Sequence, residues 1–335
     1  MRLVVRLGQR RRDLHELQAD DLQALLFEAR EDFTGDAALD GVARAGRGDD
    51  LVRDTPAHAD TDRIIHKTHS AKYERDLEDA CRAGYRLFHS LDNPISSASF
   101  AAARTAVGTA LTAAAALCGT DTPVCAPSEH AGVPVPHNRA FVVARPPGHH
   151  AERTTAMGFC FFNTIACVAE WLREQPGIER VFVFDFDVHH GNGTQHLFEE
   201  RDDVYYASMH RFPFYPGTGA AEEIGIGKGR GFTMNIPFDE GTGDAPYLRA
   251  VEDVIVRTID DYAPHAILLS SGFDAHRRDP LGGMRVTEQA YGEITRRIVE
   301  AAERHCGGRI LSLLEGGYDT EGLASSVAEH VNALS

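Results

Sequence analysis

The sequence predicts a single α/β domain in which helices flank both faces of a mostly parallel central sheet. Three observations lead to this prediction. The chain has 335 residues, which is long enough for one large α/β domain. Five short segments are almost entirely apolar, and helical segments lie between them. Strands of that kind, alternating with helices, are typical of a parallel sheet that is covered on both sides.

The predicted strands have the strongest sequence pattern in the chain. Each is a run of four or five residues that are apolar except for Ser312, and many of them are β-branched or aromatic, as is typical of a buried strand. They cover residues 141–144, 181–184, 204–207, 266–269 and 310–314.

The predicted helices follow from composition and spacing. Residues 99–118 are Ala-rich and weakly polar, and we interpret them as a buried helix because Arg104 and several threonines interrupt the apolar run. Residues 244–262 are amphipathic and begin at Asp244, a favourable residue at a helix start. Further helices are expected at residues 14–29, 163–173 and 287–305, and from about residue 321.

We expect residues 1–335 to form one domain, with a divergent N-terminal segment (1–60) and a regular region (61–335). The basic run at residues 10–12 is followed at once by acidic residues, so a targeting peptide is not expected. Six cysteines are scattered along the chain without a C-x-x-C pair. This usage favours a reducing compartment, and we therefore predict a cytoplasmic protein.

Charge and hydropathy exclude some classes of function. The formal net charge is −16, and nucleic acid is not an expected partner because phosphate binding needs a basic surface. No apolar run approaches the roughly 20 residues of a membrane span, so no membrane association is expected. The negative charge is compatible with a cationic substrate or partner.

A polar cluster follows every predicted strand, and four of the five clusters contain glycine. In doubly wound sheets, ligands bind beyond the carboxyl ends of the strands, so these clusters predict the functional site. They are RPPGHH at 145–150, DFDVHHGNG at 185–193, SMH at 208–210, SSGFD at 270–274 and EGGY at 315–318.

The second cluster suggests a metal site. Alternate side chains of an extended segment point to the same side, so Asp187 and His189 can converge on one ion, with Asp274 as the third ligand. Two carboxylates and one imidazole leave coordination positions open, as in catalytic zinc sites. The alternative is that Asp185 and Asp187 cap a turn and His189 only packs.

Three further side chains suit hydrolytic chemistry. His149 and His150 follow a Pro-Pro-Gly turn, and adjacent imidazoles suit proton transfer because histidine titrates near neutrality. Tyr318 follows two glycines at a strand end, where its hydroxyl could donate to a developing oxyanion. The alternative is that the histidines are exposed or core residues and that the tyrosine belongs to the core.

Together these motifs resemble those of the histone deacetylase family of zinc amidohydrolases, which includes bacterial enzymes that hydrolyse acetylpolyamines. The resemblance begins at about residue 66, reaches the C-terminus and is closer to class II than to class I. It implies the fold shared by arginases and deacetylases. The stretches that carry it are RPPGHH at 145–150, GFCFFN at 158–163, DFDVHHGNG at 185–193, FYPGTG at 214–219, GFD at 272–274, DPLGG at 279–283 and EGGY at 315–318.

The resemblance implies one catalytic zinc ion (or iron) bound by Asp187, His189 and Asp274. His150 would be the general base that activates water and then the acid that protonates the leaving amine. Asn192 would lie behind His150, where class I relatives have Asp.

The remaining catalytic roles also come from the resemblance. His149, oriented by Asp185, would contribute electrostatically. Tyr318 would hydrogen-bond the scissile carbonyl and its oxyanion. One structural potassium ion is implied near Asp185, with ligand oxygens from Asp185, Asp187, His189, Ser208 and Met209. The family pattern allows one or two such ions, and the second would lie near Phe198 and Val204.

The resemblance also assigns substrate contacts. Gly158, Phe159 and Tyr215 would line an acyl-lysine tunnel, although many relatives have Phe in place of Tyr215. Asp92 would be the rim aspartate that receives substrate backbone amides. Leu281 stands where a polyamine-selective relative carries Glu, which mildly favours acyl-lysine.

Three functions follow in order of preference. The first is zinc-dependent deacetylation of acetyl-lysine in proteins or peptides, and the second is hydrolysis of acetylpolyamines. The third is a non-catalytic binding module with the same fold, which the complete set of site residues disfavours. The sequence motif of the family's usual N-terminal loop cannot be recognised in residues 1–60. Whether that segment narrows the mouth of the site or builds a homo-oligomer contact stays open.

Overall fold

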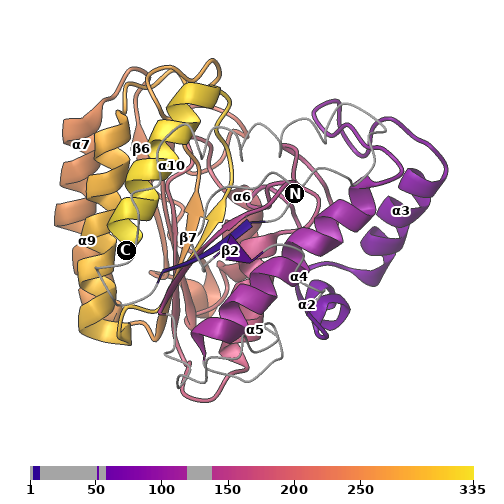
Figure 1. The fold of residues 1–335 in the computed structure, drawn as a ribbon, viewed down its shortest axis with the longest axis horizontal. Helices are drawn as coiled ribbons and strands as arrows, with labels where there is room; N and C mark the ends of the chain where they lie inside the picture. Colours follow the sequence, from indigo (N-terminus) through magenta and orange to yellow (C-terminus); the bar gives the residue numbers. More distant parts are fainter. Residues whose placement is uncertain (1–2, 8–50, 53–57, 119–137) are drawn as a thin grey trace.

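The computed structural model describes residues 3–7, 51–52, 58–118 and 138–335, and its centre is one eight-stranded sheet (Figure 1). The spatial order of the strands is β2-β1-β3-β8-β7-β4-β5-β6. Their bounds are β1 (Leu3–Leu7), β2 (Leu51–Val52), β3 (Arg139–Val143), β4 (Val181–Asp185), β5 (Val204–Arg211), β6 (Thr233–Phe238), β7 (Ala266–Ser271) and β8 (Ile310–Leu314).

The predicted mostly parallel sheet is confirmed. Strands β3, β8, β7, β4, β5 and β6 pair in parallel, and β1 and β2 add an antiparallel edge. All five predicted strands are present. Strand β6 was not predicted because it is a half-buried edge strand whose sequence includes Asn235 and Pro237.

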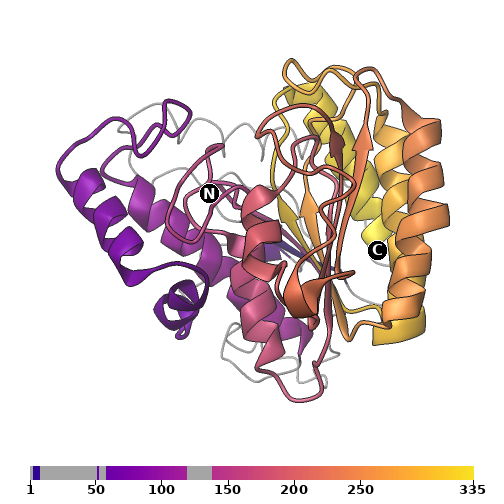
Figure 2. The same ribbon diagram turned by 180° about the vertical axis from the view of Figure 1, so that it is seen from behind.

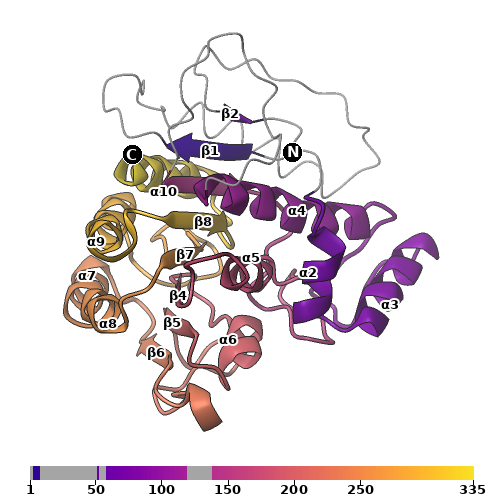
Figure 3. The ribbon, with the colours of Figure 1, turned by 90° about the horizontal axis from the view of Figure 1, so that it is seen from below.

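Helices form a layer on each face of the sheet, as Figure 3 shows from below. One layer holds α7 to α10, and the other holds α2 to α6; Figure 2 shows the same two layers from behind. Their bounds are α2 (Thr61–Thr68), α3 (Ala71–Arg82), α4 (Ser99–Leu117), α5 (Thr164–Arg173), α6 (Asn192–Phe198), α7 (Asp244–Ala250), α8 (Val256–Tyr262), α9 (Glu288–Cys306) and α10 (Thr320–Leu334).

The predicted helices agree with these elements in the part of the chain that is described. The helix expected at residues 244–262 is continuous, with a π-helical turn (Val251–Ile255) between α7 and α8. Helices α2, α3 and α6 were not predicted. The helix expected at residues 14–29 lies outside the described residues.

Helix α4 is long and apolar enough to cross a membrane by length and composition alone. However, 67% of its apolar window is buried inside the protein, where it contacts α5, β3 and β8. The position agrees with the predicted buried helix.

The register of the parallel strands brings their carboxyl ends to one edge. Asp185 at the end of β4 pairs with Ser208 of β5 on one side and Ser270 of β7 on the other. The next strand, β8, ends beside β7, where Ser271 pairs with Leu314. The polar clusters that follow these strands therefore start close together, as expected for this sheet class.

Candidate active site

The three predicted metal ligands meet at this edge. Asp187 and His189 lie in the turn after β4, and Asp274 lies in the turn after β7. One ligand atom from each falls within 4.8 Å of the others. The Nδ1 atom of His189 lies 3.1 Å from Asp187 Oδ1 and 3.1 Å from Asp274 Oδ2. Both carboxylates are fully buried, so this group is inside the protein rather than on its surface.

Backbone amides hold the two carboxylates in place. Gly316 N donates to Asp187 Oδ2 at 2.8 Å, and Val188 N donates to Asp274 Oδ1 at 2.9 Å. These contacts join the turns after β4, β7 and β8. Each carboxylate is therefore oriented by a loop other than its own.

Glycines next to the site make this close approach possible. A Cβ atom on Gly272 would overlap the carboxylate of Asp187, and one on Gly316 would overlap both Asp274 and Asp187. The glycine-rich composition of the clusters thus has a steric cause: the backbone touches the ligands where a side chain would not fit.

The donor set fits a divalent cation. Burial and the charge of Asp187 raise the pKa of Asp274 above its usual value. Burial would lower the pKa of His189, but Asp187 and Asp274 outweigh it and raise that pKa to about 10. Carboxylates crowded together in a buried place favour a positive charge between them, and zinc accepts this mixture of nitrogen and oxygen ligands.

The adjacent histidines differ in their partners although their ring centroids are only 4.0 Å apart. His149 Nδ1 lies 3.0 Å from Asp185 Oδ2, an oxygen that also accepts from the Tyr206 hydroxyl at 3.1 Å. His150 Nδ1 lies 2.8 Å from Asn192 Oδ1. One imidazole therefore has a carboxylate partner and the other a neutral amide.

This difference separates their proton affinities. Burial would lower the pKa of His149, but the charges of Asp185 and Asp187 reverse the effect and raise it to about 10. The pKa of His150 is well below its usual value because of burial and the neighbouring His149 and His189. Groups whose environments separate their pKa values in this way are typical of acid–base sites.

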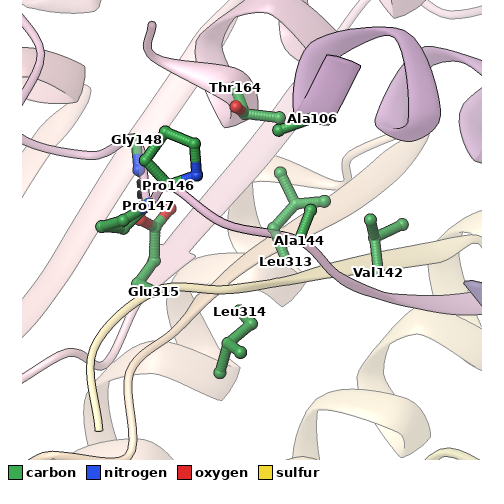
Figure 4. A pocket seen from close by; sticks show the side chains of 10 residues that line it. All are labelled: Ala106, Val142, Ala144, Pro146, Pro147, Gly148, Thr164, Leu313, Leu314 and Glu315. Carbon is green, nitrogen blue, oxygen red and sulfur yellow. Dashed lines mark hydrogen bonds between the residues drawn. The ribbon is translucent and has the colours of Figure 1, made fainter. Parts of the chain in front are cut away.

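Glu315 is a buried acid whose role the sequence did not reveal. Its Oε2 accepts from Gly148 N at 2.7 Å and from His149 N at 3.2 Å, so it anchors the turn that carries both histidines. Figure 4 shows Glu315 beside Gly148 in the wall of a mostly apolar pocket. Burial raises the pKa of Glu315 to about 7. The only signal was its position directly before two glycines at a strand end.

Aromatic rings gather beside the histidines. The ring of Tyr215 meets that of His150 edge to face at 5.1 Å, and the ring of Phe159 lies 6.1 Å from that of Tyr318. Phe214, which was not predicted, stacks on His189 at 5.2 Å. The sequence signal for Phe214 was its place next to Tyr215 in the FYPGTG motif.

The predicted rim residues form a connected structure. Asp92 Oδ2 accepts from Gly158 N and from the Tyr215 hydroxyl, both at 2.9 Å. Asn93, which was not predicted, accepts from Phe159 N at 2.9 Å. These bonds hold Gly158 and Phe159 at positive φ angles of 60° and 65°, a strained conformation for a phenylalanine.

Leu281 and Tyr318 are linked through Asp279. One oxygen of Asp279 accepts from Leu281 N at 2.9 Å, and the other accepts from Tyr318 N at 2.7 Å. Leu281 is 47% exposed, whereas Tyr318 is half-buried. Leu281 is thus a surface residue tied to the loop that carries Tyr318.

The residues predicted near potassium lie beside the site. Ser208 pairs with Asp185 in the sheet, and its hydroxyl lies 2.9 Å from His210 Nδ1. Met209 is buried in the core below the α7–α10 layer. The potassium site stays a prediction.

Comparisons with known proteins agree with this architecture. Residues 36–334 match the family model of the histone deacetylase domain. The crystal structure of the HDA15 HD domain superposes with a TM-score of 0.73 at 32% identity, covering 84% of this chain and 74% of that one.

Two curated relatives extend the comparison. A probable deacetylase of Archaeoglobus fulgidus is 45% identical over 183 residues, which cover 55% of this chain and 51% of that protein. A histone deacetylase-like amidohydrolase of Pseudomonas aeruginosa is 37% identical over 271 residues, covering 80% and 66%. The match thus spans about half the length of the first relative and about two thirds of the second. With its fold, its buried Asp-His-Asp group and a family match over nearly its whole length, this chain belongs to the histone deacetylase family.

Proposed function

We propose that this chain hydrolyses the amide bond of an N-acetylated amine, with acetyl-lysine in a protein or peptide as the preferred substrate and one zinc ion as cofactor. The observation that carries the proposal is the buried group of Asp187, His189 and Asp274, which lies beside two histidines. The pKa of His149 is raised and that of His150 is lowered. A binding module that performs no chemistry would not need this arrangement.

The residues of this site have separate roles in metal binding and proton transfer. Asp187, His189 and Asp274 would hold the zinc ion, which supplies Lewis acidity to polarise an amide carbonyl and lower the pKa of a neighbouring water molecule. His150, with its low proton affinity, takes a proton from water and then returns it to the leaving amine.

Two residues stabilise the charges that develop. His149, held protonated by Asp185, adds positive charge next to His150. The Tyr318 hydroxyl donates to the oxyanion of the tetrahedral intermediate. Burial keeps the pKa of Tyr318 well above its usual value, so this hydroxyl retains its proton.

A second candidate substrate, an acetylpolyamine, is favoured by one observation at the rim. Asp92 Oδ2 already accepts two hydrogen bonds, from Gly158 and Tyr215, so it is less available to the backbone amides of a peptide. A polyamine has no such amides. The apolar side chain of Leu281 favours acetyl-lysine instead, because it offers no charge to a second ammonium group.

A substrate panel on the zinc-reconstituted protein tests the proposal. It crosses acyl length with amine type, using lysine peptides and putrescine that carry acetyl or longer acyl groups. We expect the highest kcat/KM for the acetyl-lysine peptide. A preference for acetylputrescine selects the second candidate, and absence of hydrolysis across the panel contradicts both.

The matched variant for this panel is Leu281→Glu, which adds a carboxylate at an exposed position of the rim. We expect it to move selectivity toward acetylputrescine and to leave zinc content unchanged.

A further inference from the structure

A chain of hydrogen bonds leads from the active site to the protein surface. His150 Nδ1 lies 2.8 Å from Asn192 Oδ1, and Asn192 Nδ2 donates to Glu152 Oε1. The same Glu152 oxygen lies 2.8 Å from Nδ1 of His196. His150 and Asn192 are buried, whereas the side chains of Glu152 and His196 are 21% and 41% exposed.

The surroundings of Asn192 define which way its amide points. Its Nδ2 atom faces three acceptors: the Glu152 carboxylate, the His150 carbonyl oxygen at 3.4 Å and the Met157 sulfur at 3.4 Å. Reversing the amide would place Oδ1 against the same groups, which offer it no proton. A carboxylate is acceptor-only when ionised and forms the strongest of the three bonds. Glu152 therefore contributes most to the orientation.

The amide orientation in turn defines the tautomer of His150. Since Asn192 Oδ1 can only accept, the bond of 2.8 Å requires the proton of the imidazole to sit on Nδ1. A neutral imidazole carries one ring proton, so Nε2 is left as the free base. In the opposite tautomer, Nε2 would carry the proton and could not take one from water.

We propose that Glu152 is a positioning residue: it holds the amide of Asn192 so that His150 keeps its proton on Nδ1 and presents Nε2 as the base. This role rests on the proposed hydrolytic function. His196 supports it from the surface by its bond to the same carboxylate oxygen.

Variants of the Glu152 side chain leave its backbone contacts intact. Glu152 N donates to Thr155 O at 2.9 Å, and Glu152 O lies 2.9 Å from Nδ1 of the buried His69. These two contacts involve only the backbone of Glu152, so they hold the loop around it even when the carboxylate is removed. Glu152→Gln keeps an acceptor oxygen for Asn192, Glu152→Ala removes it, and Glu200→Ala is the control at an exposed glutamate of the neighbouring turn.

The direct test is a long-range ¹H–¹⁵N spectrum of the full-length, zinc-loaded protein with ¹⁵N-labelled histidine. The signals of the His150 ring are identified because they are missing from the spectrum of His150→Ala. We expect the Nδ1–H form of His150 in the wild type, Glu152→Gln and Glu200→Ala. In Glu152→Ala we expect a mixture with the Nε2–H form. An unchanged Nδ1–H form in Glu152→Ala overturns the proposal.

Kinetics add a second readout. In Glu152→Ala we expect kcat to fall by about 10- to 100-fold, as for other residues that orient a functional side chain. KM should stay near the wild-type value, and Glu152→Gln should restore most of the activity. A wild-type kcat in Glu152→Ala contradicts the proposal. If the wild type hydrolyses no acetylated amine, the proposed function fails, while the spectrum still decides whether Glu152 controls the tautomer.

Discussion

Two buried polar clusters lie near strands β7 and β8, and they differ in charge. The strand-end cluster comprises Asp274 with Asp187 and His189. The serine–histidine cluster lies on the face covered by α9 and α10 and comprises Ser271, Ser312, His330 and Thr295.

The serine–histidine cluster is neutral and complete. The Thr295 hydroxyl donates to Tyr291 O and lies 2.7 Å from His330 Nδ1, while His330 Nε2 lies 2.8 Å from the Ser312 hydroxyl. The Ser312 hydroxyl lies 2.7 Å from that of Ser271. One consistent assignment of protons satisfies every one of these bonds, and burial lowers the pKa of His330 to about 3.

The charges of the strand-end cluster are not balanced in this way. It places two carboxylates around one imidazole, and burial with the charge of Asp187 raises the pKa of Asp274. Buried polar residues alone therefore do not identify a functional site, because a closed neutral network serves stability. A buried excess of like charge, oriented by backbone donors, identifies a place for a cation.

Among the variants that test this comparison, His150→Ala should have the largest effect on kcat. Loss of the proton acceptor should lower kcat by about 10²- to 10⁴-fold, because general acid–base catalysis contributes that much. Zinc content should stay at one per chain, since His150 is not among the proposed ligands. Steady-state kinetics with metal analysis checks both, and activity close to wild type would remove His150 from the mechanism.

Tyr318→Phe should have the next largest effect. We expect its kcat to be about 10²- to 10³-fold lower, because one donor to the oxyanion is lost. The ring and the backbone bond to Asp279 stay, so folding and metal content should not change. Retained kcat would show that Tyr318 is a packing residue.

Thr295→Val tests the other cluster. The valine keeps the shape of threonine but leaves His330 Nδ1 without an acceptor in a fully buried place. We expect the free energy of unfolding to fall by about 1–3 kcal/mol. The kcat per folded molecule should be unchanged, as denaturant titration and kinetics at low temperature can measure. A large change in kcat would show that the two clusters are coupled.

The last prediction concerns the pH dependence of stability. His330 has a folded-state pKa of about 3 against about 6.5 when unfolded, so the unfolded state binds more protons between these values. The contribution of His330 to the free energy of unfolding should therefore fall as pH drops below about 6.5, with a slope near 1.4 kcal/mol per pH unit, and level off below about 3. His330→Gln should have a shallower slope in that window. Equal slopes for the two proteins would mean that His330 is protonated in the folded state.

Sequence reasoning succeeded where local spacing and sheet topology act together. Apolar runs identified five of the six interior strands that the structure describes, namely β3, β4, β5, β7 and β8. The alternation of Asp187 and His189, with the strand-end rule for Asp274, predicted that these three residues meet. The edge strand β6 lacked an apolar pattern because only one side of it has a partner strand.

The residues that were missed act through contacts distant in sequence. Glu315 anchors Gly148 from 167 positions away, and Asn93 accepts from Phe159 N across 66 positions. No local pattern specifies such pairs, because they depend on how the loops after different strands fold over one another. Glu152 was missed for a related reason: its role depends on the amide orientation of Asn192.

We propose above all that the strand-end cluster is a hydrolytic metal centre. The most direct measurement titrates zinc into metal-free wild-type protein and into Asp274→Asn while following acetate release from an acetyl-lysine peptide and from acetylputrescine. We predict that acetate release by the wild type rises with zinc until one ion is bound per chain, and that Asp274→Asn neither retains zinc at these concentrations nor releases acetate. Zinc binding of equal strength in Asp274→Asn, or a zinc-saturated wild type that releases no acetate from either substrate, would contradict the claim.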